Sequence, residues 1–147
     1  MKKILWIENN PDLIARFREI LDTVEWELFI ARSLRSADYK VEKEPGLSSI
    51  DTIIMDLNMD EYRFEAPYDD YRKELFEERE FDLTGLIWLR RLIESNPDYP
   101  PERIAVLSGF IDDGITEELK RFVPEVTVIE KLSFDVIEKL VDFCAKK

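Results

Sequence analysis

The stretch IDTIIMDLNMD, residues 50–60, decides the fold that this sequence predicts. Residues 52–55 are apolar or β-branched without polar alternation, which is typical of a strand covered on both faces in a parallel sheet. Asp56 then interrupts the run with a lone carboxylate, so we expect it at or near the carboxyl end of that strand. Ligands of open α/β sheets bind just beyond the carboxyl ends of the strands, which makes Asp56 the first candidate for a functional residue.

The composition favours one compact domain and disfavours binding to polyanions. The chain has 147 residues, of which 45% are hydrophobic and 12% aromatic, enough for a sizeable core. Its formal net charge is −12, so a nucleic-acid backbone or an anionic membrane surface would repel most of the protein. We expect a single domain over residues 1–147, with no direct contact to nucleic acid or membrane.

The absence of histidine and the single cysteine limit the catalytic and metal-binding chemistry that the chain can support. The absence of histidine excludes histidine catalysis, histidine metal ligation and phosphorylation of this chain on histidine. The one cysteine, Cys144, cannot form an internal disulfide or a thiolate metal site. The first residues lack the long apolar stretch of a signal sequence, and no segment approaches the roughly 20 apolar residues of a membrane helix. These features predict a cytoplasmic location.

Five apolar runs alternate with helical patterns along the chain. Strands are predicted over residues 4–7, 27–31, 52–57, 104–107 and 126–129. Helices are predicted over residues 11–24, 34–44, 85–94 and 112–122, and from a cap at Ser133 to about Cys144. This alternation selects an α/β fold with right-handed crossovers. We expect a doubly wound, five-stranded parallel sheet with the flavodoxin-like order 2-1-3-4-5.

The segment between the third strand and the helix at residues 85–94 is interpreted as an insertion. Residues 60–83 contain ten acidic and four basic side chains, so they carry half of the net charge of −12. Six aromatic residues in the same segment argue against a plain disordered tether. We expect a short amphipathic helix there, and we interpret the segment as a lid or a partner-specific element beside Asp56.

Polar side chains lie at or just after the ends of four of the five predicted strands. They are two carboxylates, two amides, a hydroxyl and an ammonium, namely Glu8, Asn9, Asp56, Asn58, Ser108 and Lys131. The order 2-1-3-4-5 makes these four strands consecutive neighbours, so the side chains are expected to share one crevice. Such groups suit a phosphoryl group together with Mg²⁺, which takes one or two carboxylates and completes its shell with water and phosphate oxygens. Simpler roles as helix caps or solvated side chains remain open.

Five stretches, taken together, resemble the response-regulator receiver domain of two-component signalling. ILWIENNPDL resembles the family's first strand with its acidic pair, and DTIIMDLNM resembles the phosphoacceptor strand. TGLIWLRRLIE resembles the third helix, IAVLSG the strand that bears the hydroxyl, and VTVIEK the strand that bears the lysine. The resemblance covers the chain from Lys2 to about Cys144, except for the insertion.

The resemblance implies a role for each group. Asp56 would be the phosphoacceptor, while Lys131 and Mg²⁺ would offset charge on the phosphoryl oxygens and Ser108 would donate a hydrogen bond. The chain would then be a phosphoprotein, with slow self-dephosphorylation at most, and not an enzyme that acts on a separate substrate.

By the same resemblance, Mg²⁺ would be bound by Asp56, by Glu8 or Asn9 directly or through water, and by the backbone carbonyl of Asn58. The phosphoryl donor would be a histidine kinase or a histidine phosphotransfer protein. No effector domain fits within 147 residues, so we expect a stand-alone receiver that signals by binding a downstream protein. The family's habit of pairing through the fourth helix, fifth strand and fifth helix leaves a homodimer open.

The chain departs from the family pattern in three informative ways. Glu8 and Asn9 replace two acidic residues, which leaves two carboxylates and predicts a metal affinity lowered by about 10 to 100-fold. Leu132 replaces the proline of a cis peptide, so we expect a trans bond there, which leaves the direction of Lys131 open. Val128 replaces a switching aromatic and has no ring to rotate inward.

Two other functions compete with a phosphorylated receiver. The first is a pseudo-receiver, an interaction module that keeps the fold without metal-dependent phosphorylation, and the departures above favour it. The second is a phosphatase with an aspartyl nucleophile, which Asp56-Leu57-Asn58 superficially resembles. That class needs a second carboxylate two residues after the nucleophile, where this chain has Asn58.

Overall fold

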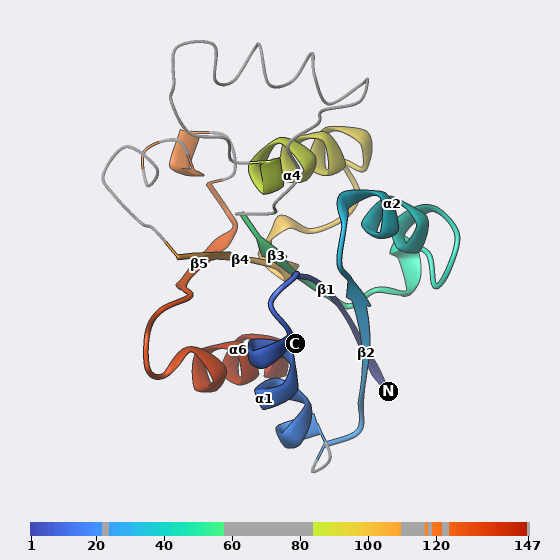
Figure 1. Ribbon diagram of the computed structural model, residues 1–147. Helices are drawn as coiled ribbons and strands as arrows, with labels where there is room; N and C mark the ends of the chain where they lie inside the picture. Colours follow the sequence, from blue (N-terminus) through green and yellow to red (C-terminus); the bar gives the residue numbers. More distant parts are fainter. Residues whose placement is uncertain (22–23, 58–83, 110–116, 118, 122–123, 147) are drawn as a thin grey trace.

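The protein is built around a five-stranded parallel sheet (Figure 1). The computed structural model describes residues 1–21, 24–57, 84–109, 117, 119–121 and 124–146. The strands are β1 (Lys2–Ile7), β2 (Trp26–Ala31), β3 (Thr52–Asp56), β4 (Ile104–Ser108) and β5 (Thr127–Glu130). Their order is β2-β1-β3-β4-β5 and every neighbouring pair is parallel, which confirms the predicted sheet.

Helices cover both faces of the sheet. The described α-helices are α1 (Pro11–Leu21), α2 (Leu34–Glu42), α4 (Thr84–Ser95) and α6 (Val136–Ala145). Short 3₁₀ helices at Leu47–Ser49 and Pro101–Arg103 lead into β3 and β4. Figure 1 shows α1 and α6 on one face of the sheet and α2 and α4 on the other. Right-handed crossovers produce this doubly wound arrangement.

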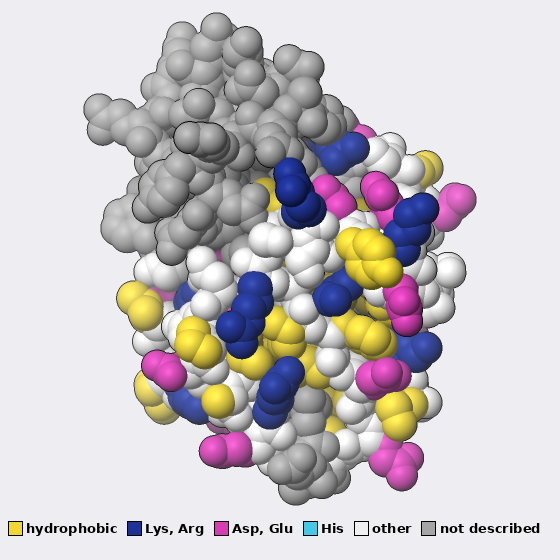
Figure 2. Space-filling model, turned by 45° about the vertical axis from the view of Figure 1, so that its right-hand side comes forward, with side chains coloured by type: hydrophobic (Ala, Val, Ile, Leu, Met, Phe, Trp, Pro, Cys, Tyr) yellow, Lys and Arg dark blue, Asp and Glu magenta, His cyan; other side chains and the backbone are white. Residues whose placement is uncertain are grey.

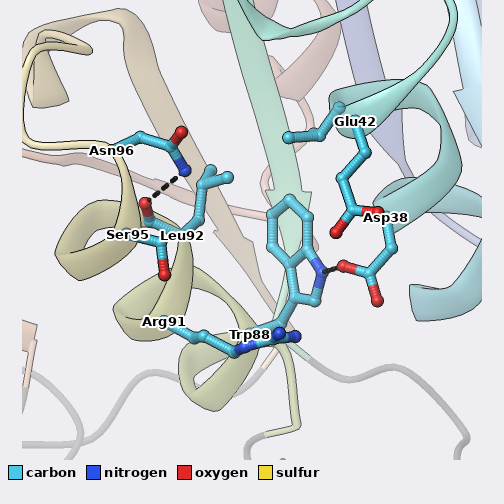
Figure 3. A pocket seen from close by; sticks show the side chains of 8 residues that line it. Asp38, Glu42, Trp88, Arg91, Leu92, Ser95 and Asn96 are labelled. Carbon is cyan, nitrogen blue, oxygen red and sulfur yellow. Dashed lines mark hydrogen bonds between the residues drawn. The ribbon is translucent and has the colours of Figure 1, made fainter.

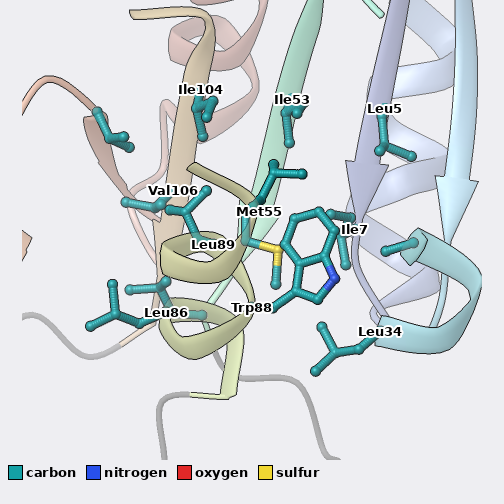
Figure 4. Packing of buried hydrophobic residues seen from close by; sticks show 14 of the residues in the cluster. Leu5, Ile7, Leu34, Ile53, Met55, Leu86, Trp88, Leu89, Ile104 and Val106 are labelled. Carbon is teal, nitrogen blue, oxygen red and sulfur yellow. The ribbon is translucent and has the colours of Figure 1, made fainter. Parts of the chain in front are cut away.

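The core consists of two apolar layers, one on each face of the sheet. On the side of α2 and α4, Met55 and Val106 of the sheet pack with Leu89 of α4 (Figure 4). On the side of α1 and α6, the ring of Trp6 meets the ring of Phe17 edge-on, with centroids 5.2 Å apart and planes at 81°. Alternate residues of a strand enter opposite layers, which explains why the strands contain unbroken apolar runs.

The strand register brings the carboxyl ends of the central strands to one edge of the sheet. Ile7 of β1 lies opposite Met55 of β3. Ser108 of β4 lies opposite Glu130 of β5. Asp56 and Ser108, which end β3 and β4, therefore lie at the same edge as the residues that directly follow β1 and β5. The sequence predicted the functional groups at this edge.

Helix α1 begins at residue 11 as predicted, whereas α6 begins later than predicted. Asn10 caps α1, because its Oδ1 accepts a hydrogen bond from the Asp12 N–H at 3.0 Å. The cap residue of α6 is Asp135, so the predicted Ser133 cap is wrong. Residues 134 and 135 form a turn before the first helical residue, and Ser133 donates its hydroxyl proton to the Asp135 carboxylate instead.

Two predicted segments fall partly or wholly outside the described residues. The insertion at residues 60–83 lies outside them, together with its expected amphipathic helix. Of the predicted helix at residues 112–122, positions 117 and 119–121 are described, and all of them are helical. The insertion and the full length of that helix stay predictions.

The described surface mixes charges of both signs. On the face in Figure 2, Lys and Arg side chains are interspersed with acidic and hydrophobic ones. Large exposed hydrophobic side chains in or just after β5 are Val128, Leu132 and Phe134. No helix among the described residues is both long and apolar enough to cross a membrane.

Substitution of Leu89 by alanine should lower the free energy of unfolding by about 2–5 kcal/mol, because Leu89 is fully buried between α4 and the sheet. Urea denaturation followed by circular dichroism measures the change. Leu132→Ala is the matched control, since Leu132 is 78% exposed, and its effect should stay within about 0.5 kcal/mol. Equal effects of the two substitutions would contradict this placement of Leu89.

Candidate functional site

Asp56 is the centre of the candidate site. It is the last residue of β3 and is fully buried. The strand lies between β1 and β4, so the carboxylate has neighbouring strand ends on both sides. A buried carboxylate is costly without a counter-charge, and the groups that compensate it therefore define the site.

Glu8 lies beside Asp56, directly after β1. Its backbone N–H donates to the carbonyl of Ala31 at 2.9 Å, which extends the pairing of β1 with β2 by one residue. The side chain is fully buried, and its Oε1 accepts a hydrogen bond from the Asn10 N–H at 3.1 Å. Glu8 is therefore fixed at both its backbone and its carboxylate.

Lys131 joins the two carboxylates. Its backbone N–H donates to the carbonyl of Ser108 at 2.9 Å, which holds the first residue after β5 against the end of β4. Its ammonium donates to Glu8 Oε1 at 2.7 Å and to Asp56 Oδ2 at 2.8 Å. The side chain of Lys131 is 16% exposed, so this ion pair is largely shielded from water.

Burial and charge shift the protonation equilibria of the site. Burial raises the pKa of Glu8 from its ordinary 4.5 to about 7, and the negative charge of Asp56 adds to the effect. Burial alone would lower the pKa of Lys131, but its hydrogen bonds to Asp56 and Glu8 raise the pKa above the ordinary value. Lys131 is therefore a cation at neutral pH, while Glu8 is close to its midpoint.

The other predicted site residues have different positions. Ser108 is the last residue of β4 and is almost fully buried, one residue beyond the partner of Asp56. Asn9 is half-buried in the loop between Glu8 and α1. Asn58 lies outside the described residues. The structure thus places Glu8, Asp56 and Lys131 in direct contact and Ser108 on the adjacent strand end.

The oxygen atoms of the site fit a hard divalent cation. Glu8 Oε2 is buried and accepts no hydrogen bond within the described part of the chain, so a cation would satisfy it. Glu8 and Asp56 supply the one or two carboxylates that Mg²⁺ takes. The described residues contain no group of three or more His, Cys, Asp or Glu side chains able to hold a metal.

Gly85 is a residue that sequence reasoning missed. A Cβ at this position would lie 2.4 Å from the carbonyl oxygen of Asp56 and 2.7 Å from Cα of Leu57. The N–H of Gly85 also donates to the carbonyl of Leu57 at 3.1 Å. Only glycine lets the first turn of α4 approach the end of β3 this closely. A glycine just before an apolar helical pattern was the available signal.

The structure shows the effect of two departures from the family pattern, Leu132 just after β5 and Val128 within it. Within the described part of the chain, the one cis peptide bond is Glu44–Pro45, so the predicted trans bond between Lys131 and Leu132 is confirmed. Lys131 still reaches Asp56, because its backbone is held by Ser108. Val128, which stands where the family often has a switching aromatic residue, is 40% exposed.

A separate cavity of about 280 Å³ lies between α2 and α4 (Figure 3). Trp88 from α4 and Asp38 from α2 point toward each other across it, and Trp88 Nε1 donates to Asp38 Oδ1 at 2.8 Å. Leu92 and Asn96 line the cavity on the side of α4. None of the predicted site residues lines it, so we interpret it as part of the contact between the two helices.

Comparison with known proteins finds solved structures that are similar to this chain. No protein-family model and no curated protein matches the sequence. The receiver domain of the Francisella response regulator 1452 has a TM-score of 0.65 at 15% identity, with 98% of this chain and 93% of that chain covered. For the Vibrio cholerae chemotaxis protein CheY4 the TM-score is 0.63 at 18% identity, with 97% and 94% covered. The Mn²⁺-bound form of the response regulator Rcp1 has a TM-score of 0.63 at 19% identity, with 96% of this chain and 89% of that chain covered.

The fold is therefore that of response-regulator receiver domains, over nearly the whole chain. This confirms the resemblance drawn from the five sequence stretches. At such identities the likeness concerns the fold, and the function has to be argued from the site itself.

Replacing Gly85 by alanine should lower the free energy of unfolding by about 1–3 kcal/mol, because the backbone of β3 occupies the space that a Cβ needs. Thermal and urea unfolding measure this effect. Gly109→Ala is the control, since a Cβ there meets nothing within 4 Å. A Gly85→Ala protein as stable as the Gly109→Ala protein would refute the close approach.

The raised pKa of Glu8 predicts a pH-dependent stability in metal-free buffer. Folded protein holds this proton more tightly than unfolded chain, so the free energy of unfolding falls as pH rises from 4.5 to about 7 and then levels off. The difference between the unaltered chain and Glu8→Gln should change across this window by on the order of 2 kcal/mol, with allowance for solvent screening. Urea titrations with EDTA at both ends of the window measure it, and a pH-independent difference would contradict the shift.

Proposed function

We propose that the protein is a response-regulator receiver that accepts a phosphoryl group on Asp56 from a histidine kinase or a histidine phosphotransfer protein. The observation that supports this most is the 2.8 Å contact of the Lys131 ammonium with the buried Asp56 carboxylate, in a chain with the receiver-domain fold. Its output is a protein–protein contact that changes when Asp56 is phosphorylated.

Asp56 is the nucleophile of the proposed transfer. One of its carboxylate oxygens forms a bond to the phosphorus of the partner's phosphohistidine while the phosphorus–nitrogen bond breaks. The electron pair of that bond returns to the partner's imidazole, which takes up a proton from solvent. The product is an acyl phosphate on Asp56, and water later hydrolyses it slowly. The protein is thus a phosphoacceptor, not an enzyme with a separate substrate.

Lys131 and Ser108 act on the oxygens of the phosphoryl group. The ammonium has three N–H bonds, of which two are directed to Glu8 and Asp56, and the third is available to a phosphoryl oxygen. Ser108 presents its hydroxyl from the neighbouring strand end and donates a second hydrogen bond. Together they offset the negative charge that arrives beside two carboxylates.

Mg²⁺ is the proposed cofactor, and when bound it neutralises charge on the phosphoryl oxygens. Glu8 and Asp56 are the carboxylates that would hold it, with Asn9 and the backbone carbonyl of Asn58 as further oxygen ligands. The matching structure of Rcp1 contains Mn²⁺, which supports a divalent cation in this fold. We also propose that the protein acts in the cytoplasm, where kinase and receiver meet.

Acetyl phosphate with Mg²⁺ should add a phosphoryl group to the unaltered chain, and Asp56→Asn should abolish the adduct because an amide is not nucleophilic. Intact-mass spectrometry measures it. The matched control is Asp51→Asn, an exposed residue at the opposite end of β3, which should be labelled like the unaltered chain. An adduct that persists in Asp56→Asn would place the acceptor elsewhere, and no adduct at saturating Mg²⁺ would favour the pseudo-receiver.

A further inference from the structure

The outer side of β2 carries backbone groups that are open to a further strand. β2 is one edge of the described sheet, where it pairs with β1. The Glu8 N–H donates to the carbonyl of Ala31, so the backbone of Ala31 is directed toward β1. Because successive residues of the strand are directed to alternate sides, the N–H and C=O groups of Leu28 and Ile30 are directed outward. Among the described residues, no backbone hydrogen bond from outside the sheet reaches these two residues.

The sequence of β2, WELFIA, has few of the features that protect an edge strand from pairing. Proline, lysine and bulges are common protective devices, but β2 contains neither proline nor lysine, and its register with β1 is regular from Trp26 to Ala31. Its inner residues Leu28, Phe29 and Ile30 are apolar and only partly buried. Figure 1 shows β2 at the right-hand border of the sheet, and Figure 2 brings that side forward, where hydrophobic side chains lie among charged ones of both signs.

Charges are separated along this edge in a way that favours an antiparallel copy of the same strand. Four exposed charged residues flank its apolar centre, namely Glu25 and Glu27 at the start and Arg32 and Arg35 beyond the end. An antiparallel copy would place the acidic start of each strand along the basic end of the other, whereas a parallel copy would align like charges. These four charges cancel, although the whole chain carries −12, so the edge itself is not repelled by a second copy.

We propose that β2 forms the interface of a homodimer, in which the β2 strands of two copies pair antiparallel about a two-fold axis at Phe29. The two sheets then become one continuous sheet. Leu28 lies opposite the partner's Ile30, and each donates its N–H to the carbonyl of the other; the two-fold axis repeats this pair. Phe29 meets the partner's Phe29 where side chains across antiparallel strands lie closest. At both ends Trp26 lies opposite the partner's Arg32, which forms a cation–π contact.

The neighbouring registers fit this edge less well. An axis at Leu28 would set Glu27 against the partner's Phe29, and an axis at Ile30 would set Leu28 against the partner's Arg32. Each of them brings a charge against a hydrocarbon side chain that cannot pair with it. β1 lies between β2 and the strand of Asp56, so the proposed pairing uses other elements than the phosphoryl-transfer site and does not depend on it.

Charge reversal at the two exposed ends tests the pairing with little risk to the fold. Sedimentation velocity of the full chain over a range of concentrations should show a monomer–dimer equilibrium. Glu27→Lys and Arg32→Glu should each raise the dimer dissociation constant at least about 10-fold, because each creates two like-charge contacts in the dimer. The double variant restores opposite charges and should return the constant to that of the unaltered chain. Glu102→Lys, an equally exposed substitution ahead of β4, is the control that should change nothing.

Cross-linking tests the register. The proposed axis places two copies of Phe29→Cys close enough for a disulfide, so oxidation with copper phenanthroline should give a covalent dimer on non-reducing electrophoresis. Glu102→Cys should stay monomeric under the same treatment, and Cys144 is buried in both variants.

Three results would overturn the inference. The first is a chain that stays monomeric at every concentration, and the second is a dimer that the single charge reversals do not weaken, since it would use another surface. The third is a double variant that associates no better than the single ones.

Discussion

One ammonium shared by two buried carboxylates is the interaction on which the rest of the site depends. Glu8 and Asp56 are fully buried, and Lys131 contacts both within 2.8 Å. Desolvation of three charges costs about as much free energy as their attraction returns, so the cluster adds little to stability. Loss of Lys131, however, would leave two buried carboxylates without a counter-charge. A cluster of this kind is easier to explain by what it binds than by the stability it provides.

Much of this arrangement could be predicted from the sequence, because it depends mainly on the parallel direction of the strands. Asp56 ends an apolar run, Glu8 follows another and Lys131 follows a third. Parallel strands put all of their carboxyl ends at one edge, so the order β2-β1-β3-β4-β5 is enough to bring these residues together. The trans bond before Leu132 also followed from simple energetics.

The remaining features depend on contacts between distant parts of the chain. Gly85 looks like an ordinary helix residue until the carbonyl of Asp56 is seen in the space of its missing Cβ. Glu8 Oε1 accepts hydrogen bonds from both the Asn10 N–H and the Lys131 ammonium. This contact follows from the strand register and the loop path, which no local sequence pattern encodes. Ser133 is a good cap residue by type, yet a turn at residues 134 and 135 moved the helix start beyond it.

The central claim is that an acyl phosphate forms on Asp56 within reach of Lys131 and Ser108. A crystal structure of the full chain with Mg²⁺ and beryllofluoride, which mimics the phosphoryl group on a carboxylate, tests it most directly. We expect beryllofluoride bonded to an Asp56 oxygen, with its fluorines in contact with the Lys131 ammonium and the Ser108 hydroxyl. An unmodified Asp56, with Lys131 still paired to both carboxylates under saturating beryllofluoride, would contradict it.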